Sequence, residues 1–174
     1  MHTEASLQTD IARALHTILT GICREPDDLE LLECRNGKKT IISCKSGNND
    51  YRILVGREGK TVHAIQRIVT RAGRESGHWL QFDLLTNGVG DNPTLKPFVA
   101  NPNFNEAIFI RLLKDLLAAA GVDSAGLEMR KDPTRLHALV PAKSIEDRAT
   151  LSDCNTLFFA WGYRQGRKIS IHSK

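Results

Sequence analysis

Two glycines separated by two charged residues, with an amphipathic helical pattern directly behind them, constrain this chain most strongly. The motif is Gly56-Arg57-Glu58-Gly59. Glycine permits a tight turn and lets a ligand approach the backbone closely. A helix that begins directly after such a turn points its unpaired N–H groups and the positive end of its dipole at whatever occupies the turn. The motif therefore predicts a loop suited to phosphate groups.

The spacing after the motif predicts a helix from Lys60 to about Gly73, with two distinct faces. The face expected to pack against a core carries Val62, Ile65, Ile68, Val69 and Ala72. A second face is basic and carries Lys60, His63, Arg67, Arg71 and Arg74. Such a stripe is either a surface for a polyanion or only a solvated helix face. Its start at a glycine turn favours the polyanion.

Positive charge is concentrated around the motif. The whole chain of 174 residues has a formal net charge of +4 at pH 7. Residues 1–34 have a net charge of −5, whereas residues 35–74 have a net charge of +8. A cluster of cations suits a polyanionic partner, because neutralising phosphates releases counterions and supplies affinity that does not depend on sequence. This distribution favours nucleic acid as the partner.

No residue pattern indicates catalysis. Gly59-Lys60-Thr61 is similar to the end of a P-loop, but that motif requires a glycine where Leu54 stands. The six histidines are scattered, and Ser152-Asp153-Cys154 offers a nucleophile type without a visible base. The four cysteines form no C-x-x-C pair, so they are expected to be buried thiols. We expect no enzyme activity, no cofactor and no metal site.

The expected element order in the first half is helix, strand, strand, short helix, glycine turn, helix and strand. The first helix is expected over residues 6–23, and the two strands over residues 29–35 and 38–44. Asn36-Gly37 between them predicts a two-residue hairpin turn with positive φ at both central residues. Asn49 or Asp50 is expected to cap the short helix, and the third strand is expected over residues 79–85.

This order, with the glycine turn between two helices, resembles a KH domain of type II, and most closely the small stand-alone bacterial KH proteins. Leu54-Val55 precede the motif and a basic helix follows it, as is typical of that family. The resemblance covers about residues 6–85. It implies an α-β-β-α-α-β fold that binds about four nucleotides of single-stranded RNA, or of DNA as the alternative, without catalysis.

The resemblance also implies an RNA-binding surface around the loop. Gly56 and Gly59 would approach the phosphates, and Arg57 and Lys60 would neutralise them. Glu58 departs from an electrostatically favourable loop, and either lowers the affinity or pairs with Arg57 and faces away. The expected RNA-binding residues are Ile53, Val55, Gly56, Arg57, Glu58, Gly59, Lys60, Thr61, His63 and Arg67. The apolar members of this set would line the groove for the bases or the core beneath it.

The second half repeats the element order of the first. Glycines and prolines predict a linker over residues 87–103, after a KH domain over residues 1–86. Asn103 and Glu106 predict a capping box and a helix to about Ala120. Strands at 126–130 and 136–140, a helical region at 147–163 and a strand at 168–172 follow. Residues 104–174 are therefore expected to form a second α+β unit, a degenerate KH-like tandem repeat.

This second unit has no Gly-x-x-Gly, and Glu146-Asp147 are poorly suited to a phosphate. Its expected role is packing, or contact with a protein partner or a second copy of the chain. The segment from Trp161 to Lys168 interleaves aromatic and basic residues, and either stacks on a nucleic-acid strand or is core followed by an ordinary helix end. The start of the chain lacks a signal-peptide pattern, and no apolar run is long enough to span a membrane, so a cytoplasmic location is expected.

Two functions remain open from the sequence. The first is non-catalytic binding of single-stranded RNA through the glycine loop and the basic helix. The alternative is a protein-interaction or structural module that keeps the KH-like fold without binding nucleic acid.

Overall fold

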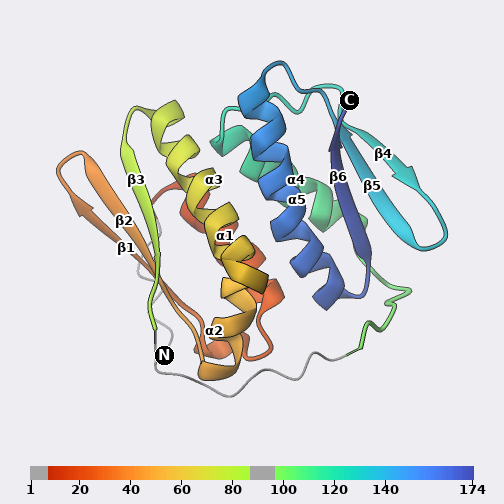
Figure 1. The fold of residues 1–174 in the computed structure, drawn as a ribbon, viewed down its shortest axis with the longest axis horizontal. Helices are drawn as coiled ribbons and strands as arrows, with labels where there is room; N and C mark the ends of the chain where they lie inside the picture. Colours follow the sequence, from red (N-terminus) through yellow and green to blue (C-terminus); the bar gives the residue numbers. More distant parts are fainter. Residues whose placement is uncertain (1–7, 87–96) are drawn as a thin grey trace.

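The computed structural model describes residues 8–86 and 97–174 as a mixed α+β structure (Figure 1), so the predicted α+β class is confirmed. Two sheets form the outer layers, and the helices fill the space between them. The first half consists of α1 (Asp10–Ile22), η1 (Pro26–Asp28), β1 (Glu30–Asn36), β2 (Lys39–Lys45), α2 (Asn48–Val55), η2 (Arg57–Gly59), α3 (Lys60–Ser76) and β3 (Trp79–Leu84). The second half consists of α4 (Glu106–Ala119), β4 (Glu128–Lys131), β5 (Arg135–Val140), α5 (Ile145–Gln165) and β6 (Lys168–Ser173). Part of the predicted linker, residues 87–96, and the predicted start of the first helix lie outside the described residues.

The two sheets have the same topology. In the first, β2 is the central strand, antiparallel to β1 and parallel to β3. In the second, β5 is the central strand, antiparallel to β4 and parallel to β6. Each parallel pair is joined through a helix that lies on the inner side of its sheet, α3 in one half and α5 in the other (Figure 1). The two halves therefore share the order and the directions of their strands in the structure.

The helix α3 does not end near Gly73, where the sequence predicted its end, but continues to Ser76. Gly77 caps it in the left-handed conformation, with φ of 71°. Gly73 lies inside the helix, and a Cβ added there would stand 2.7 Å from the backbone oxygen of His78. The glycine is therefore needed for β3 to pack closely on α3 rather than to stop the helix.

The helix α5 ends in the same way. Gly166 is its left-handed cap, with φ of 79°. Gly162 lies four residues earlier, and a Cβ added there would stand 2.5 Å from the backbone oxygen of Arg167. The same Gly-x-x-x-Gly spacing thus shapes the joint between helix and strand in both halves, and this spacing is visible in the sequence.

The halves differ in the connection before that helix. In the first half, α2 and the glycine turn lie between β2 and α3. In the second half, only residues 141–144 separate β5 from α5. Within the described part of the chain, the second half has no counterpart of α2 or of the glycine turn, and its sequence contains no Gly-x-x-Gly.

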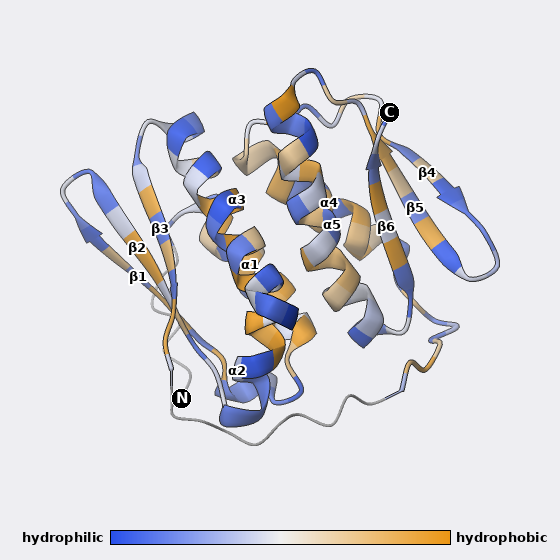
Figure 2. Cartoon of the chain, viewed as in Figure 1, coloured by the Kyte–Doolittle hydropathy of each residue, from blue (hydrophilic) through white to orange (hydrophobic). Residues whose placement is uncertain are grey.

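A single apolar core joins the two halves. Helices of the middle layers carry apolar residues where they meet (Figure 2), and the buried cluster includes side chains of α1, α3, α4 and α5. Gly21 of α1 lies against Trp161 of α5 so closely that a Cβ at Gly21 would stand 2.3 Å from the indole Nε1. The Gln165 side chain donates a hydrogen bond of 2.8 Å to the Gly21 carbonyl oxygen. Trp161 is only 5% exposed, so this residue of the aromatic and basic segment belongs to the core.

The first hairpin turn lies one residue, and the cap of α4 two residues, after the position predicted from the sequence. The hairpin turn consists of Gly37 and Lys38, and only Gly37 has positive φ, as at the first central position of a type II′ turn. The cap of α4 is Asn105 and not Asn103, and its side chain accepts a hydrogen bond from the N–H of Ile108.

None of the helices in the described ranges is long and apolar enough to cross a membrane.

Candidate nucleic-acid interface

The loop between α2 and α3 has an unusual backbone. Gly56, Glu58 and Gly59 have φ values of 74°, 54° and 75°, all in the left-handed region. A Cβ at Gly56 would stand 2.2 Å from the Thr61 hydroxyl oxygen and 2.9 Å from the Thr61 backbone nitrogen. Thr61 is buried beneath the loop. Glycine at position 56 is therefore required by close packing as well as by its dihedral angle.

The loop leads straight into the N-terminus of the 17-residue helix α3. Gly59 occupies the cap position, and no side chain makes a capping hydrogen bond there. The first turn of α3 contains no acidic residue, although an acid would be favoured by the helix dipole. The N–H groups of Gly59 and Lys60 donate within the turn, to the carbonyl oxygens of Gly56 and Arg57, so the positive end of the helix dipole, rather than a set of free N–H groups, lies beside the loop.

The charged side chains of the loop are in solvent. The side chains of Arg57, Glu58 and Lys60 are 89%, 69% and 67% exposed. A Glu58 carboxylate oxygen lies 3.9 Å from Arg57 Nε, and the other lies 3.7 Å from Lys60 Nζ. Glu58 therefore pairs with both cations. Exposed ion pairs of this kind contribute about 0–1 kcal/mol, so a phosphate can displace the carboxylate at little cost.

The remaining residues predicted in this region lie around the loop. His63 is exposed, and its ring lies over Gly59, where a Cβ would stand 3.0 Å from the ring. Ile53 is half-buried and packs against the core. Val55, the last residue of α2, is also half-buried. The structure thus brings nine of the predicted residues together at one end of α3, with Arg67 one to two helical turns away.

Asp50 holds α2 and the loop in place. The sequence suggested it as a helix cap, but Gly47 occupies that position and Asp50 is fully buried. Its two carboxylate oxygens accept hydrogen bonds of 2.8 and 2.9 Å from the backbone N–H groups of Arg24 and Glu25. Because those residues follow α1, Asp50 ties the loop-bearing helix to the end of α1.

The basic face of α3 does not remain free along its length. The Arg67 guanidinium donates hydrogen bonds of 2.6 to 3.1 Å to the Asp153 carboxylate of α5, and this contact raises the pKa of Arg67. Farther along, Arg74 lies 3.3 Å from Glu146. Arg67 is therefore already neutralised by α5, and a phosphate at this position would compete with Asp153.

Arg71 is buried at the centre of this contact, although the stripe predicted it on an exposed basic face. Its guanidinium donates hydrogen bonds of 2.6 Å to Asp147 and 2.7 Å to the Thr150 hydroxyl. The hydrogen bond from Arg71 holds the pKa of Asp147 below its ordinary value. The acids of α5 are spaced to face the arginines of α3, but Glu146 and Asp147 were interpreted only as unsuited to phosphate, and Asp153 only as part of a segment with a nucleophile type.

Metal ligands and reactive cysteines are the other kinds of site that the sequence raised. In the ranges that the structure describes, no group of three or more His, Cys, Asp or Glu side chains is placed to hold a metal ion. Burial raises the pKa of both Cys44 and Cys154 to about 12, so these thiols stay protonated at neutral pH. Cys23 is also buried, but Cys34 is exposed, contrary to the expectation that all four would be buried.

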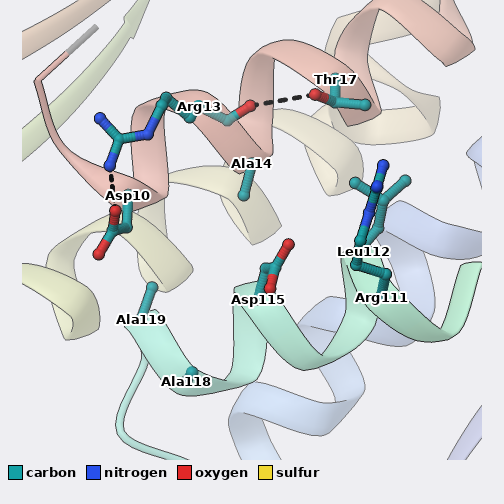
Figure 3. A pocket seen from close by; sticks show the side chains of 9 residues that line it. All are labelled: Asp10, Arg13, Ala14, Thr17, Arg111, Leu112, Asp115, Ala118 and Ala119. Atoms are coloured by element: carbon teal, nitrogen blue, oxygen red, sulfur yellow. Dashed lines mark hydrogen bonds and ion pairs between the residues drawn. The ribbon is translucent and has the colours of Figure 1, made fainter. Parts of the chain in front are cut away.

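A cleft of about 620 Å³ opens between α1 and α4 (Figure 3). Its floor is formed by small apolar side chains such as Ala14 and Ala118. Its rim carries charges of both signs, with Arg13 paired to Asp10 and Arg111 near Asp115. The balanced rim suits a polyanion less well than the glycine loop does.

No protein-family model matches the chain, and no curated protein matches it. The resemblance of residues 6–85 to KH domains therefore stays a prediction from the glycine motif and the element order. The chemistry of the loop and its neighbours carries the functional argument.

Proposed function

We propose that the chain binds single-stranded RNA without catalysis, through the loop and helix start at residues 56–60. One observation carries the proposal. A left-handed glycine loop leads directly into a helix N-terminus that no side chain caps, with two exposed cations, Arg57 and Lys60, beside it. A helix N-terminus and cations that lie together favour an anion such as a phosphate group.

The energetic balance of the loop favours an anion. Lys60 stands in the first turn of α3, where a cation is repelled by the helix dipole. Glu58 offsets this repulsion through a single contact of 3.7 Å with Lys60 in solvent. A phosphate at the loop would contact the backbone, Arg57 and Lys60 together, and the glycines leave room for its approach.

We further infer that the first half is a type II KH domain and the second half a degenerate copy of it. The element order α1-β1-β2-α2-α3-β3 supports the first statement. The shared sheet topology and the shared glycine spacing of α3 and α5 support the second. On this basis a strand of about four nucleotides would place its bases toward the apolar side chains of Ile53 and Val55.

A binding titration tests the proposal. In the double variant Arg57→Asp/Glu58→Asp, the loop becomes acidic, and affinity for a short single-stranded RNA should be abolished. Wild-type affinity should fall steeply with salt, by a slope of about −0.7 per phosphate neutralised. The control is Arg111→Asp, which makes the same change in net charge at the cleft between α1 and α4 and should leave the affinity nearly unchanged.

Two results would contradict the proposal. Equal RNA affinity of the double variant and the wild type would show that the loop is not the site. Absence of wild-type binding at low salt would favour the alternative, a protein-interaction module. Parallel titrations with DNA of the same sequence decide between the two nucleic acids, and circular dichroism of the variant shows whether it is folded.

A further inference from the structure

Two aromatic side chains of α5 and one from the segment before α4 form a row on the surface. The Phe159 and Tyr163 ring centroids are 6.4 Å apart, and Tyr163 and Phe98 follow at 5.4 Å. The Lys168 ammonium lies 5.3 Å from the centre of the Phe98 ring, at the end of the row. Phe159 is 50% exposed and Tyr163 is 37% exposed. We call Phe98, Phe159 and Tyr163 the aromatic row.

The aromatic row does not fill the apolar core. The inward face of α5 is already filled by Leu157, Phe158 and Trp161, all of them buried. Phe159 and Tyr163 are four residues apart, so they lie one above the other on the opposite, solvent face of the helix. An exposed cluster of large aromatic side chains is a candidate for contact with a ligand.

The contacts between α3 and α5 place the row level with the glycine loop along the helix axes. The pairs Arg67–Asp153 and Arg74–Glu146 show that the two helices run antiparallel. From the Arg67–Asp153 pair, Lys60 lies seven residues along α3, about 10 Å away, and Phe159 lies six residues along α5, about 9 Å away. The two residues are thus level with each other on adjacent helices, which lie side by side in Figure 1.

We propose that the aromatic row stacks the bases of a single strand whose phosphates are held at residues 56–60. This inference rests on the proposed function and extends it, since it gives the second half a direct role in binding. Every base, whatever the sequence, has a flat face that can stack on an aromatic ring. A row of rings would therefore add affinity with little sequence discrimination. Lys168 at the end of the row would contact the next phosphate.

Single-stranded nucleic acid fits the row better than a protein partner does. The row ends at Lys168, and Lys60 lies on the adjacent helix at the level of Phe159. Successive rings at 5.4 and 6.4 Å with a cation at the end of the row combine surfaces on which bases stack with charge that neutralises the backbone. A protein helix would need a longer apolar groove than this short row provides.

The test measures affinity for a single-stranded RNA of about eight nucleotides, long enough to reach from the loop across the row. Phe159→Ala should weaken binding roughly 5- to 150-fold, the range found for removing one stacking ring. The salt dependence of the affinity should stay the same, because no phosphate contact is lost. Phe159→Tyr should restore most of the affinity, since the ring is retained.

Two exposed apolar residues serve as matched controls. Ile145 is 85% exposed and lies at the opposite end of α5 from the row. Trp79 is 68% exposed and lies beside Lys39, beyond the other end of α3 from the loop. Ile145→Ala and Trp79→Ala should each leave the affinity within about twofold of the wild type. A strand of the same length without bases should bind the wild type and Phe159→Ala equally.

The outcomes separate this inference from the proposed function. In one outcome, the acidic loop variant loses binding while Phe159→Ala and the double variant Phe159→Ala/Tyr163→Ala bind as the wild type does. In that case the loop is the binding site, and the aromatic row is not a nucleic-acid surface. That result would assign the row to a protein contact. If Ile145→Ala weakens binding as much as Phe159→Ala, the stacking inference is also wrong. If the loop variant binds normally, the proposed function itself fails.

Discussion

Arg71 provides the sharpest test of how the two halves are joined. Its side chain is 8% exposed and that of its partner Asp147 is 11% exposed. The pair connects α3 of the first half to the first turn of α5 in the second half. In Arg71→Met the aliphatic volume is largely kept, but Asp147 loses its cation and stays in a site that excludes most water.

The expected magnitude follows from that burial. Removing one partner of a buried ion pair costs about 3–5 kcal/mol, because the remaining charge is uncompensated. The lower end applies here, since Arg71 Nε has no hydrogen-bond partner in the structure and Asp147 also accepts a hydrogen bond from the Lys143 N–H. A loss of about 3 kcal/mol would be a large part of the 5–15 kcal/mol typical of a folded domain.

Urea unfolding followed by circular dichroism at pH 7 measures this loss. The matched control is Arg74→Met, one turn farther along α3, where both side chains of the ion pair are more than 60% exposed. The control should cost less than about 1 kcal/mol. Adding Asp147→Asn to Arg71→Met should recover part of the stability, because the buried charge is removed. If Arg71→Met costs no more than the control, the pair does not hold the halves together.

The pH dependence of this variant has a defined sign. In the wild type, the hydrogen bond from Arg71 lowers the pKa of Asp147 below the unfolded value of about 3.9. The resulting stabilisation is complete above that value and is lost as the pH falls through the folded pKa. Without Arg71, protonation of Asp147 relieves an unpaired charge. The stability difference between wild type and variant should therefore shrink as the pH falls from 5 toward 3, and a constant difference would contradict this assignment.

Three further predictions concern the loop, the glycines and the thiols. Glu58→Asn removes the carboxylate that pairs with both cations and suits a φ of 54°, so RNA affinity at low salt should rise several-fold in a binding titration. Gly73→Ala and Gly162→Ala should each lower thermal stability measurably, since a Cβ would stand 2.7 and 2.5 Å from backbone oxygens. A thiol reagent should modify Cys34 quickly in the native protein and all four cysteines only after unfolding, as mass spectrometry can show.

Much of the fold follows from local sequence signals. The strands come from β-branched and apolar runs, and the register of the first hairpin is set by Gly37. The glycine loop was predicted from Gly56 and Gly59, whose positive φ and tight packing explain why glycine stands there. Local rules were less reliable for Gly73, because a glycine near the end of an apolar pattern resembles a cap. Its packing against β3 depends on a strand that follows later in the chain.

The ion pairs could not be predicted by the same means. A periodic stripe shows which face of a helix avoids its own core, but not what another part of the chain places over that face. Arg67 and Asp153 are far apart in sequence, and so are Arg71 and Asp147. The stripe was therefore interpreted as one basic surface. The structure divides it into an end beside the loop and a longer part that contacts α5.

This division concentrates positive charge where the ligand is proposed to bind. The acids of α5 pair with Arg67, Arg71 and Arg74, and the Arg71 pair is buried, so a strand along α3 would have to compete with these carboxylates. Lys60 and the loop cation Arg57 keep only the weak, exposed contacts with Glu58. The antiparallel packing that delivers those acids also brings the other end of α5, with its aromatic row, level with the loop. The second half, which has no glycine loop of its own, thus pairs with the arginines along α3, and we propose that its aromatic row adds base stacking to the phosphate site at the loop.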